Sequence, residues 1–338
     1  MPDRPRLTPA MADVRRAIRE TWDATGVHTG DLILVACSGG ADSMALALAA
    51  KFEGDRAGIS VGAVIIDHQL QSATKEVARV TAQKLTDSGL SPVVVRTVDV
   101  DTDAEGGLEA AARTARYDEL KIAAEAFDAK HVMLGHTLDD QAETVLLGLT
   151  RGSGPKSIAG MQRKNGMWLR PLLAIRRATT EAFCTDSGVE FWNDPHNQDS
   201  KFTRVRVRKI VLPMLEAELG PGIAESLART GEILKDDLAY LDGQALADFQ
   251  RIAKVGSTAI TFAVAELEVL PKVIRVRIYQ RALELFGTTN SRIHLKSVDE
   301  LIENWHGQKE LTLPGVRVIR KADEISFKTT KTLNPGAC

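Results

Sequence analysis

Strand-sized apolar runs alternate with segments of helical periodicity over the first half of the chain. β-prone runs end at Ala36, Ile66, Val98 and Gly135, and after each one apolar residues recur every three or four positions. This alternation is typical of a parallel sheet covered by helices. We therefore expect an α/β domain with a mostly parallel sheet and helices on both faces. The expected strands are 31–36, 62–66, 92–98 and 131–135, and the expected helices are 13–25, 43–51, 74–88, 107–127, 138–149 and 176–187.

The pattern changes after the breaker Gly220-Pro221-Gly222. Helical periodicity dominates from there, and alternating apolar residues appear only near the end, on both sides of a Pro314-Gly315 turn. We expect this part to form a second, smaller and mainly helical domain. The expected elements are a helix to about 250, helices near 267–286 and 296–305 and a hairpin within 310–328, and the expected domains are 1–216 and 217–338.

Composition places the chain among folded globular proteins, because 44% of its 338 residues are hydrophobic and 26% are charged. The longest apolar runs, 32–37 and 61–66, are far shorter than the roughly 20 residues of a membrane-spanning helix. No secretory signal is visible at the N-terminus. We therefore expect a cytoplasmic protein that does not enter a membrane, with its three cysteines reduced. The net charge of -2 means that any nucleic-acid binding depends on local basic patches.

A glycine-containing turn joins the first expected strand to the next helix at Ser38-Gly39-Gly40-Ala41-Asp42-Ser43. The backbone N–H groups of such a turn, together with the positive end of the following helix, can surround a phosphate without a lysine. A carboxylate beside phosphates repels them unless a cation lies between, so Asp42 indicates Mg²⁺. The structural alternative is a simple turn in which Asp42 or Ser43 caps the helix.

Two acids share one face of the helix expected at 138–149. Asp140 and Glu143 are three residues apart, opposite the apolar stripe, whereas Asp139 lies about 100° away from Asp140 on the helix. His136 ends the preceding strand, and the carboxyl ends of parallel strands meet at one edge of the sheet, where Ser38 also lies. The sequence therefore predicts a polar site there. The alternative is two first-turn acids and a histidine of the core.

Two further groups of cations are candidates for phosphate contacts. Arg116 follows Glu109 and Arg113 on one expected helix, although Glu109 and Arg113 are also spaced for an ordinary exposed ion pair. Five cations fall within nine residues further along the chain, and this density indicates nucleic-acid binding or, alternatively, a solvated helix flank. These five are Lys201, Arg204, Arg206, Arg208 and Lys209.

Residues 38–43 resemble the SGGxDS loop of the N-type ATP pyrophosphatases, a PP-loop superfamily that splits ATP into AMP and pyrophosphate while adenylating a substrate. Within this superfamily, four more segments are similar to the tRNA(Ile)-lysidine synthases. They are GHTLDDQAET at 135–144, RGSG at 151–154, RPLL at 170–173 and WNDPHNQD at 192–199. The similarity covers roughly residues 31–213 and implies a Rossmann-like catalytic domain.

The resemblance implies that ATP adenylates the C2 oxygen of cytidine 34 in the CAU anticodon of tRNA(Ile), after which the side-chain amine of free L-lysine displaces AMP. The cofactors would be ATP and Mg²⁺, with Mg²⁺ held by Asp42 and Asp140. The implied catalytic residues are Asp42, Arg116, His136, Asp140 and Glu143, the nucleotide-binding residues are Ser38, Gly39, Gly40, Ala41, Asp42, Ser43, Arg151 and Gly152, and the tRNA-binding residues are Lys201, Arg204, Arg206 and Arg208.

Several alternatives stay open at this point. A tRNA thiolase of the same superfamily would need reactive or cluster-binding cysteines, and the chain has no CxxC pair. A non-catalytic tRNA-binding relative would be expected to lose the loop or the acids, which are present. Thr137 departs from the resemblance, since many relatives have a second histidine there. The sequence leaves the general base open among His136, Asp140 and Glu143, and it is compatible with a monomer or a homodimer.

Overall fold

A computed structural model describes residues 7–67, 72–98, 108–152, 154–194, 199–288 and 292–329. Parts of the motifs named above, namely Ser153, residues 195–198 and the side chain of Glu109, lie outside the described residues. The chain divides into two compact units, residues 1–232 and 233–338. This division falls within one long helix, α10 (Ile223–Ile252), so the two domains at 1–216 and 217–338 remain a prediction.

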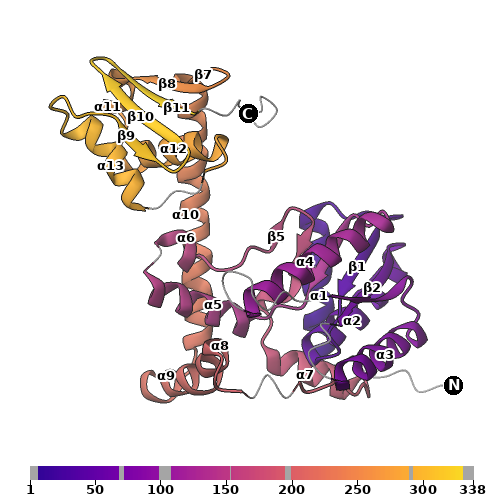
Figure 1. Cartoon of the computed structure of the whole chain (residues 1–338). Helices are drawn as coiled ribbons and strands as arrows, with labels where there is room; N and C mark the ends of the chain where they lie inside the picture. Colours follow the sequence, from indigo (N-terminus) through magenta and orange to yellow (C-terminus); the bar gives the residue numbers. More distant parts are fainter. Residues whose placement is uncertain are drawn as a thin grey trace. The chain divides into compact units, whose positions relative to one another are not determined.

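The first unit alternates strands and helices as the sequence pattern predicts (Figure 1). Its described elements are α1 (Pro9–Thr25), β1 (Leu32–Ala36), α2 (Ala41–Ala57), β2 (Ser60–Asp67), α3 (Ser72–Asp87), β3 (Val93–Thr97), α4 (Leu108–Ala126), β4 (His131–Leu134), α5 (Leu138–Arg151), α6 (Pro155–Ile158), β5 (Lys164–Asn165), β6 (Trp168–Leu169), η1 (Pro171–Ala174), α7 (Arg177–Asp186), α8 (Thr203–Arg206), η3 (Val207–Val211), α9 (Leu212–Leu219) and the first part of α10.

The sheet of this unit has the strand order β3-β2-β1-β4-β6-β5. All neighbouring strands are parallel except β5, which pairs antiparallel with β6. The chain adds β2 and β3 on one side of β1 and then crosses to add β4 on the other side. Such a change of direction leaves a crevice at the carboxyl ends of the two central strands, which is where open α/β sheets bind ligands. The segments after β1 and β4 are residues 38–43 and His136.

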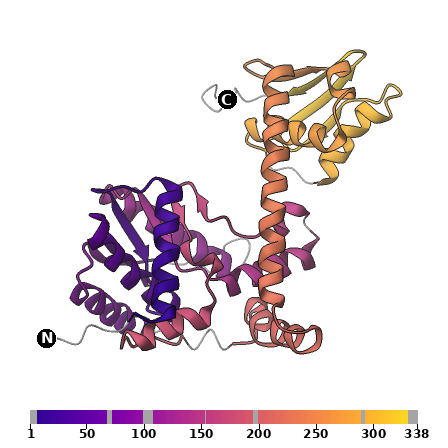
Figure 2. The same cartoon turned by 180° about the vertical axis from the view of Figure 1, so that it is seen from behind.

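Alternate residues of the central strand pack on opposite faces of the sheet. Ile33 and Val35 belong to a core that includes residues of α1, α2 and α7, whereas Leu34 and Ala36 pack with residues of α4. The two views of the chain show helices on both sides of this sheet (Figure 2). The predicted α/β fold is therefore confirmed, and helices cover both faces of the sheet at its central strands.

The second unit contains helices and an antiparallel sheet with the order β7-β8-β11-β10-β9. The expected hairpin is present, because β9 and β10 pair across Pro314-Gly315. The pairing of β8 with β11 makes the sheet larger than the sequence pattern indicated. Its elements are the end of α10, β7 (Lys254–Val255), β8 (Ala259–Ala263), α11 (Val264–Glu268), α12 (Lys272–Leu285), α13 (Arg292–Glu303), β9 (Leu311–Leu313), β10 (Val316–Lys321) and β11 (Glu324–Lys328).

Among the residues that the structure describes, none of the helices is both long and apolar enough to span a membrane.

Helix α5, which carries the two acids, is held by close contact with the segment that follows it. A Cβ atom on Gly148 would lie 2.3 Å from the carbonyl oxygen of Ser157. The side-chain amide of Gln141 donates to the carbonyl oxygen of Met161 (3.1 Å) and accepts from its N–H (2.8 Å). These contacts hold α5 against the segment at residues 157–161.

We expect Gly148→Ala to lower the free energy of unfolding by about 1–3 kcal/mol, because the added methyl group overpacks a backbone contact. Gly243→Ala in α10 is the matched control, since no atom lies within 4 Å of its added Cβ. That substitution should raise stability by about 0.5–1 kcal/mol. Urea denaturation followed by circular dichroism measures the free energy of unfolding of both variants. Equal changes in the two variants would contradict the close contact between Gly148 and Ser157.

Candidate active site

Residues 38–43 form a tight turn between β1 and α2. Gly39 has a φ of +83°, and a Cβ atom there would lie 2.6 Å from the hydroxyl oxygen of Thr81, so the turn requires glycine. The Ser43 hydroxyl accepts from the N–H of Ser38 (3.1 Å) and donates to the carbonyl oxygen of Gly40 (3.0 Å). Gly40 caps α2 without a side-chain hydrogen bond. The first turn of α2 can therefore bind an anion, as the sequence predicts.

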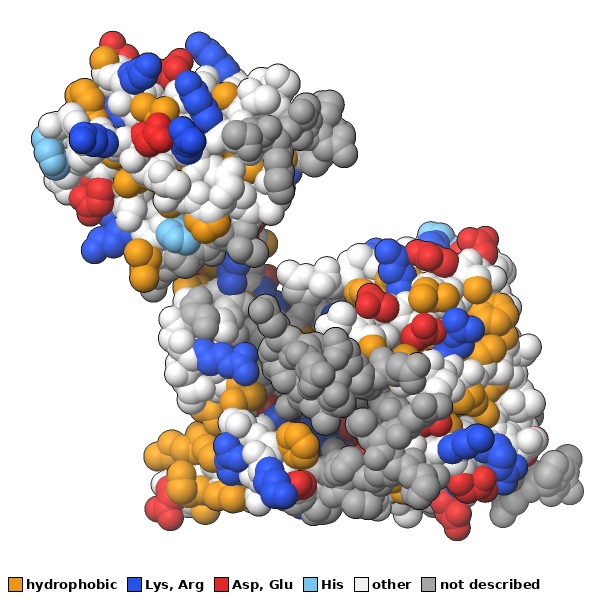
Figure 3. Space-filling view, viewed as in Figure 1, with side chains coloured by type: hydrophobic (Ala, Val, Ile, Leu, Met, Phe, Trp, Pro, Cys, Tyr) orange, Lys and Arg blue, Asp and Glu red, His pale blue; other side chains and the backbone are white. Residues whose placement is uncertain are grey.

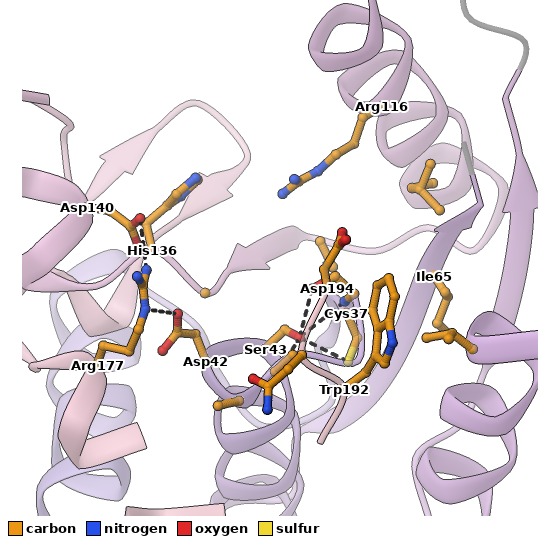
Figure 4. A pocket seen from close by; sticks show the side chains of 18 of the residues that line it. Cys37, Asp42, Ser43, Ile65, Arg116, His136, Asp140, Arg177, Trp192 and Asp194 are labelled. Atoms are coloured by element: carbon orange, nitrogen blue, oxygen red, sulfur yellow. Dashed lines mark hydrogen bonds and ion pairs between the residues drawn. The ribbon is translucent and has the colours of Figure 1, made fainter. Parts of the chain in front are cut away.

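A cavity of about 560 Å³ opens in front of this turn (Figure 4). Its two ends differ in character. One end is apolar and is lined by Val64, Ile65 and Ile66 of β2, by Val77 and Ala78 of α3 and by Trp192. The other end is charged and is lined by Asp42, Arg116, His136, Asp140, Arg177, Arg204 and Arg208. The turn lies between the two ends, so one elongated ligand with an apolar and an anionic part matches the cavity.

The sequence prediction did not include Trp192. The backbone N–H of Trp192 donates to the carbonyl oxygen of Gly39 (2.9 Å), and this hydrogen bond holds the residue against the turn. Figure 4 shows its indole beside Ile65 at the apolar end of the cavity. Trp192 gives no periodic signal, and its place at the start of the WNDPHNQD segment was the one sequence feature that could have pointed to it.

Asp140 and Glu143 are both buried near the N-terminus of α5, with 7% and 0% of their surface exposed. One carboxylate oxygen of Asp140 accepts from the N–H (2.9 Å) and the hydroxyl (3.0 Å) of Thr137. Burial acts to raise the pKa of Asp140, but Arg177 and Arg204 outweigh it and lower that pKa to about 2. Thr137, the departure from the family pattern, therefore helps to hold the first acid in place.

Arg204 and Arg208 turn toward these acids. Arg204 donates to Glu143 over 2.7 Å, and Arg208 donates to the same carboxylate over 2.5 Å and to Asp140 over 3.2 Å. A buried carboxylate needs such partners, because an isolated buried charge is strongly unfavourable. In this structure the two arginines thus neutralise the acids, and their contact with tRNA stays a prediction.

The other two cations of the predicted tRNA-binding set, Lys201 and Arg206, are exposed beside the cavity rather than in it. Arg206 donates to the carbonyl oxygens of Ser200 (2.9 Å) and Lys201 (2.8 Å). Hydrophobic side chains gather over α9 (Figure 3), where Met214 is 52% exposed.

Asp42 lies at the N-terminus of α2, and its carboxylate points toward Asp140 (Figure 4). The Nε of Arg177 donates to Asp42 over 3.0 Å, while Nη2 of the same guanidinium donates to Asp140 over 3.1 Å. The Thr180 hydroxyl donates to the other oxygen of Asp42. Burial raises the pKa of Asp42, and Arg177 opposes that rise. Neither Arg177 nor Thr180 was expected from the sequence.

Arg177 has one sequence signal that could have revealed its role. It is the first residue of α7, where the positive end of the helix disfavours a cation. A cation at that position indicates acidic partners nearby. Asp139 is one such partner, because its carboxylate accepts a hydrogen bond from the backbone N–H of Arg177 (2.7 Å) at the N-terminus of α7.

His136 and Arg116 complete the charged end of the cavity. Burial lowers the pKa of His136 to about 3, although Asp140 opposes that shift. Its Nδ1 is buried without a hydrogen-bond partner. Arg116 extends from α4 toward the cavity (Figure 4), and burial lowers its pKa. The structure thus brings Asp42, Arg116, His136 and Asp140 to one cavity, with Glu143 directly behind Asp140.

Arg151 and Gly152 are not brought to this cavity. They lie at the C-terminal end of α5, and a rise of 1.5 Å per residue places Arg151 roughly 16 Å from Asp140 along the helix axis. Their proposed contact with the nucleotide therefore stays a prediction.

The carboxylates of Asp42 and Asp140 offer the hard oxygen ligands that Mg²⁺ prefers. They are close enough for one guanidinium to bridge them, so one cation of another kind could do the same. No group of three or more metal-binding side chains occurs among the residues that the structure describes. Two carboxylates fit a Mg²⁺ that takes its other ligands from phosphates and water.

We expect His136→Asn to reduce the loss of stability in acid. The folded protein binds a proton on His136 only near pH 3, whereas the unfolded chain binds it near pH 6.5. The neutral imidazole therefore makes its full contribution to the free energy of unfolding above pH 6.5, and this contribution is lost as the pH falls toward 3. When the pH falls from 7 to 4, the free energy of unfolding should decrease by about 3 kcal/mol more in the wild type than in the variant.

Urea denaturation at the two pH values measures this difference in the free energy of unfolding. His306→Asn, at an exposed position of the second unit, is the control. Equal losses in the wild type and in His136→Asn would contradict a buried, neutral His136.

Known proteins are similar to the chain over most of its length. A PP-loop domain model matches residues 11–215, and a TilS substrate binding domain model matches residues 262–325. A tRNA(Ile)-lysidine synthase of Leifsonia xyli subsp. xyli is 51% identical over 300 residues, which cover 88% of this chain and 90% of that protein. A tRNA(Ile)-lysidine synthase of Thermobifida fusca is 44% identical over 313 residues, which cover 92% and 93% of the two chains.

A solved structure, a U34-tRNA thiolase from Methanococcus maripaludis, matches with a TM-score of 0.57 at 15% identity. The match covers 67% of this chain and 79% of the thiolase. At this identity the likeness concerns the fold alone.

The strand order, the turn at residues 38–43 and the matched domain define the first unit as a PP-loop domain, a nucleotide-binding class. More particularly, the chain belongs to the tRNA(Ile)-lysidine synthases, which are ligases that modify tRNA. The resemblance seen in the sequence is therefore confirmed. Because this identity extends over most of the chain, the thiolase and the non-catalytic protein are no longer supported.

Proposed function

We propose that the chain attaches free L-lysine to C2 of cytidine 34 in the CAU anticodon of tRNA(Ile). The C2 oxygen of cytidine attacks the α-phosphorus of ATP and pyrophosphate leaves; the lysine amine then attacks C2, AMP leaves and the amine gives up a proton. The observation that carries this proposal is one cavity that joins an anion-binding turn to the buried acid Asp140. Glu143 is fully buried and shares the partners Arg204 and Arg208 with Asp140.

The two ends of the cavity suggest how ATP lies. The adenine would occupy the apolar end between Ile65 and Trp192, where an aromatic ring can stack on a base. The triphosphate would then cross the turn at residues 38–43 toward the charged end. Arg116 extends into the same cavity and would steady phosphate charge.

A divalent cation fits the charged end of the cavity. Mg²⁺ bound by Asp42 and Asp140 would neutralise negative charge on the triphosphate. In the structure both carboxylates contact Arg177 instead. Arg177 therefore has to yield these oxygens before a metal can bind them.

The acids of α5 are placed to receive the amine. The guanidinium groups of Arg204 and Arg208 surround Glu143, which shows that cations are favourable there. A lysine ammonium would exchange with one of them. At neutral pH the pKa of about 2 for Asp140 and of about 3 for His136 make both of these groups weak proton acceptors. We propose Glu143 as the group that takes the proton, because two cations already lie against its carboxylate.

We propose that tRNA contacts the exposed Lys201 and Arg206 and the second unit, part of which matches a substrate binding domain model. Exposed surface cations bind nucleic-acid phosphates without reading sequence. The cytoplasm fits a tRNA substrate and the free thiols of Cys37 and Cys184. One chain supplies the residues named for the reaction, so a monomer or a homodimer would serve.

The direct test incubates the wild type with ATP, Mg²⁺, labelled lysine and tRNA(Ile) carrying the CAU anticodon. We expect label in the RNA together with pyrophosphate release. Asp42→Asn should lower pyrophosphate release at least about 100-fold, since the phosphates lose a preorganised electrostatic partner. Asp55→Asn on the same helix is the control, because Asp55 pairs with Lys51 at the surface. Pyrophosphate release without lysine incorporation, or normal turnover by Asp42→Asn, would refute the proposal.

A second substitution separates the two chemical steps. Glu143→Gln should lower lysine incorporation by about 100-fold and pyrophosphate release much less, because the amine loses its acceptor while the triphosphate site is kept. Glu53→Gln is the matched control, since Glu53 is also a buried glutamate with an arginine partner, Arg19. Equal losses in both steps would argue against Glu143 as the amine site.

A further inference from the structure

One arginine outside the expected catalytic set lies at the centre of the charged end of the cavity. The guanidinium of Arg177 donates to Asp42 from Nε (3.0 Å) and to Asp140 from Nη2 (3.1 Å). The two carboxylates come from the N-terminal turns of α2 and α5, which follow the two central strands β1 and β4. One side chain thus joins both halves of the crevice (Figure 4).

The backbone of Arg177 is anchored, but its side chain is not enclosed. Its N–H donates to Asp139, and α7 packs into the core of the first unit through Phe183 and Cys184. The side chain itself is 22% exposed and lines the cavity. The guanidinium can therefore leave the carboxylates while α7 stays in place.

A purely structural ion pair in this protein looks different. In the second unit, Arg275 and Asp299 pair with only 8% and 1% of their side chains exposed. Arg177 and Asp42 keep 22% and 20% exposed and face open space in front of the phosphate turn. Their pair is therefore accessible to a ligand.

Electrostatics require a cation at this position. Asp140 acts to raise the pKa of Asp42, which means that the two carboxylates repel each other. Burial acts to lower the pKa of Arg177, but Asp140 and Asp42 outweigh burial and raise it. The guanidinium thus supplies the positive charge between the two carboxylates that a bound metal ion would otherwise bring.

We propose that Arg177 is a positioning residue that keeps Asp42 and Asp140 at the spacing of one bridging cation and yields both carboxylates to the divalent ion. This inference rests on the proposed function, because it assigns the metal to the adenylation step. It predicts that Arg177 competes with a divalent ion when no nucleotide is present. Removing the guanidinium should then improve metal binding, an effect that loss of a structural contact would not produce.

The test measures binding of Mn²⁺ alone to the full-length protein by electron paramagnetic resonance. We expect Arg177→Gln to bind Mn²⁺ about tenfold more tightly than the wild type, because the competing guanidinium is removed from both carboxylates. Adding Asp42→Asn to this variant should abolish the gain. Arg176→Gln is the matched control, because the neighbouring Arg176 contacts Asp139 and Glu225 instead. Unchanged or weaker Mn²⁺ binding by Arg177→Gln would overturn the proposal.

If melting curves show that Arg177→Gln does not fold, the same measurement is made on Arg177→Lys. A lysine keeps the charge but cannot donate to both carboxylates in the forked geometry of a guanidinium. We expect it to bind Mn²⁺ about threefold more tightly than the wild type, and no gain would again overturn the proposal. Failure of lysine incorporation by the wild type would refute the proposed function alone, whatever the Mn²⁺ comparison shows.

Discussion

The charged end of the cavity depends on the compensation of buried negative charge. Asp42, Asp140 and Glu143 converge at the ends of β1 and β4, and each lies against at least one arginine. Glu143 is fully buried, and removing the partners of such a charge costs about 3–5 kcal/mol. The segments that supply the arginines, α7, α8 and η3, are therefore as necessary to the site as the sheet. The negative charge of these acids is compensated because the later segments fold back onto them.

The topology of the sheet explains why these acids meet. The strand order brings β1 and β4 side by side, so the turn at residues 38–43 and the N-terminus of α5 open at the same edge. Both helix N-termini present positive backbone groups toward one cavity. An anionic nucleotide and two carboxylates can share that cavity only with cations between them. In the structure those cations are arginine side chains.

Much of this arrangement could be read from the sequence. The apolar runs located β1 and β4, and helical spacing placed Asp140 and Glu143 on one face of α5. The partners of these acids could not be read in the same way. Arg177 is 135 positions from Asp42 along the chain, and their contact depends on how α7 packs against α2. For Arg204 and Arg208 the sequence showed the positive charge but not the group that each side chain contacts. Periodicity cannot distinguish an arginine that binds a phosphate from one that binds a buried carboxylate.

The most direct test of this account is a crystal structure with Mn²⁺ and a non-hydrolysable ATP analogue, in which anomalous scattering locates the metal. The account predicts an ion roughly 2.1 Å from carboxylate oxygens of both Asp42 and Asp140, with Arg177 no longer between them. It also predicts phosphates at residues 38–43. A metal held by phosphates and water alone, with Arg177 still bridging the two carboxylates, would contradict it.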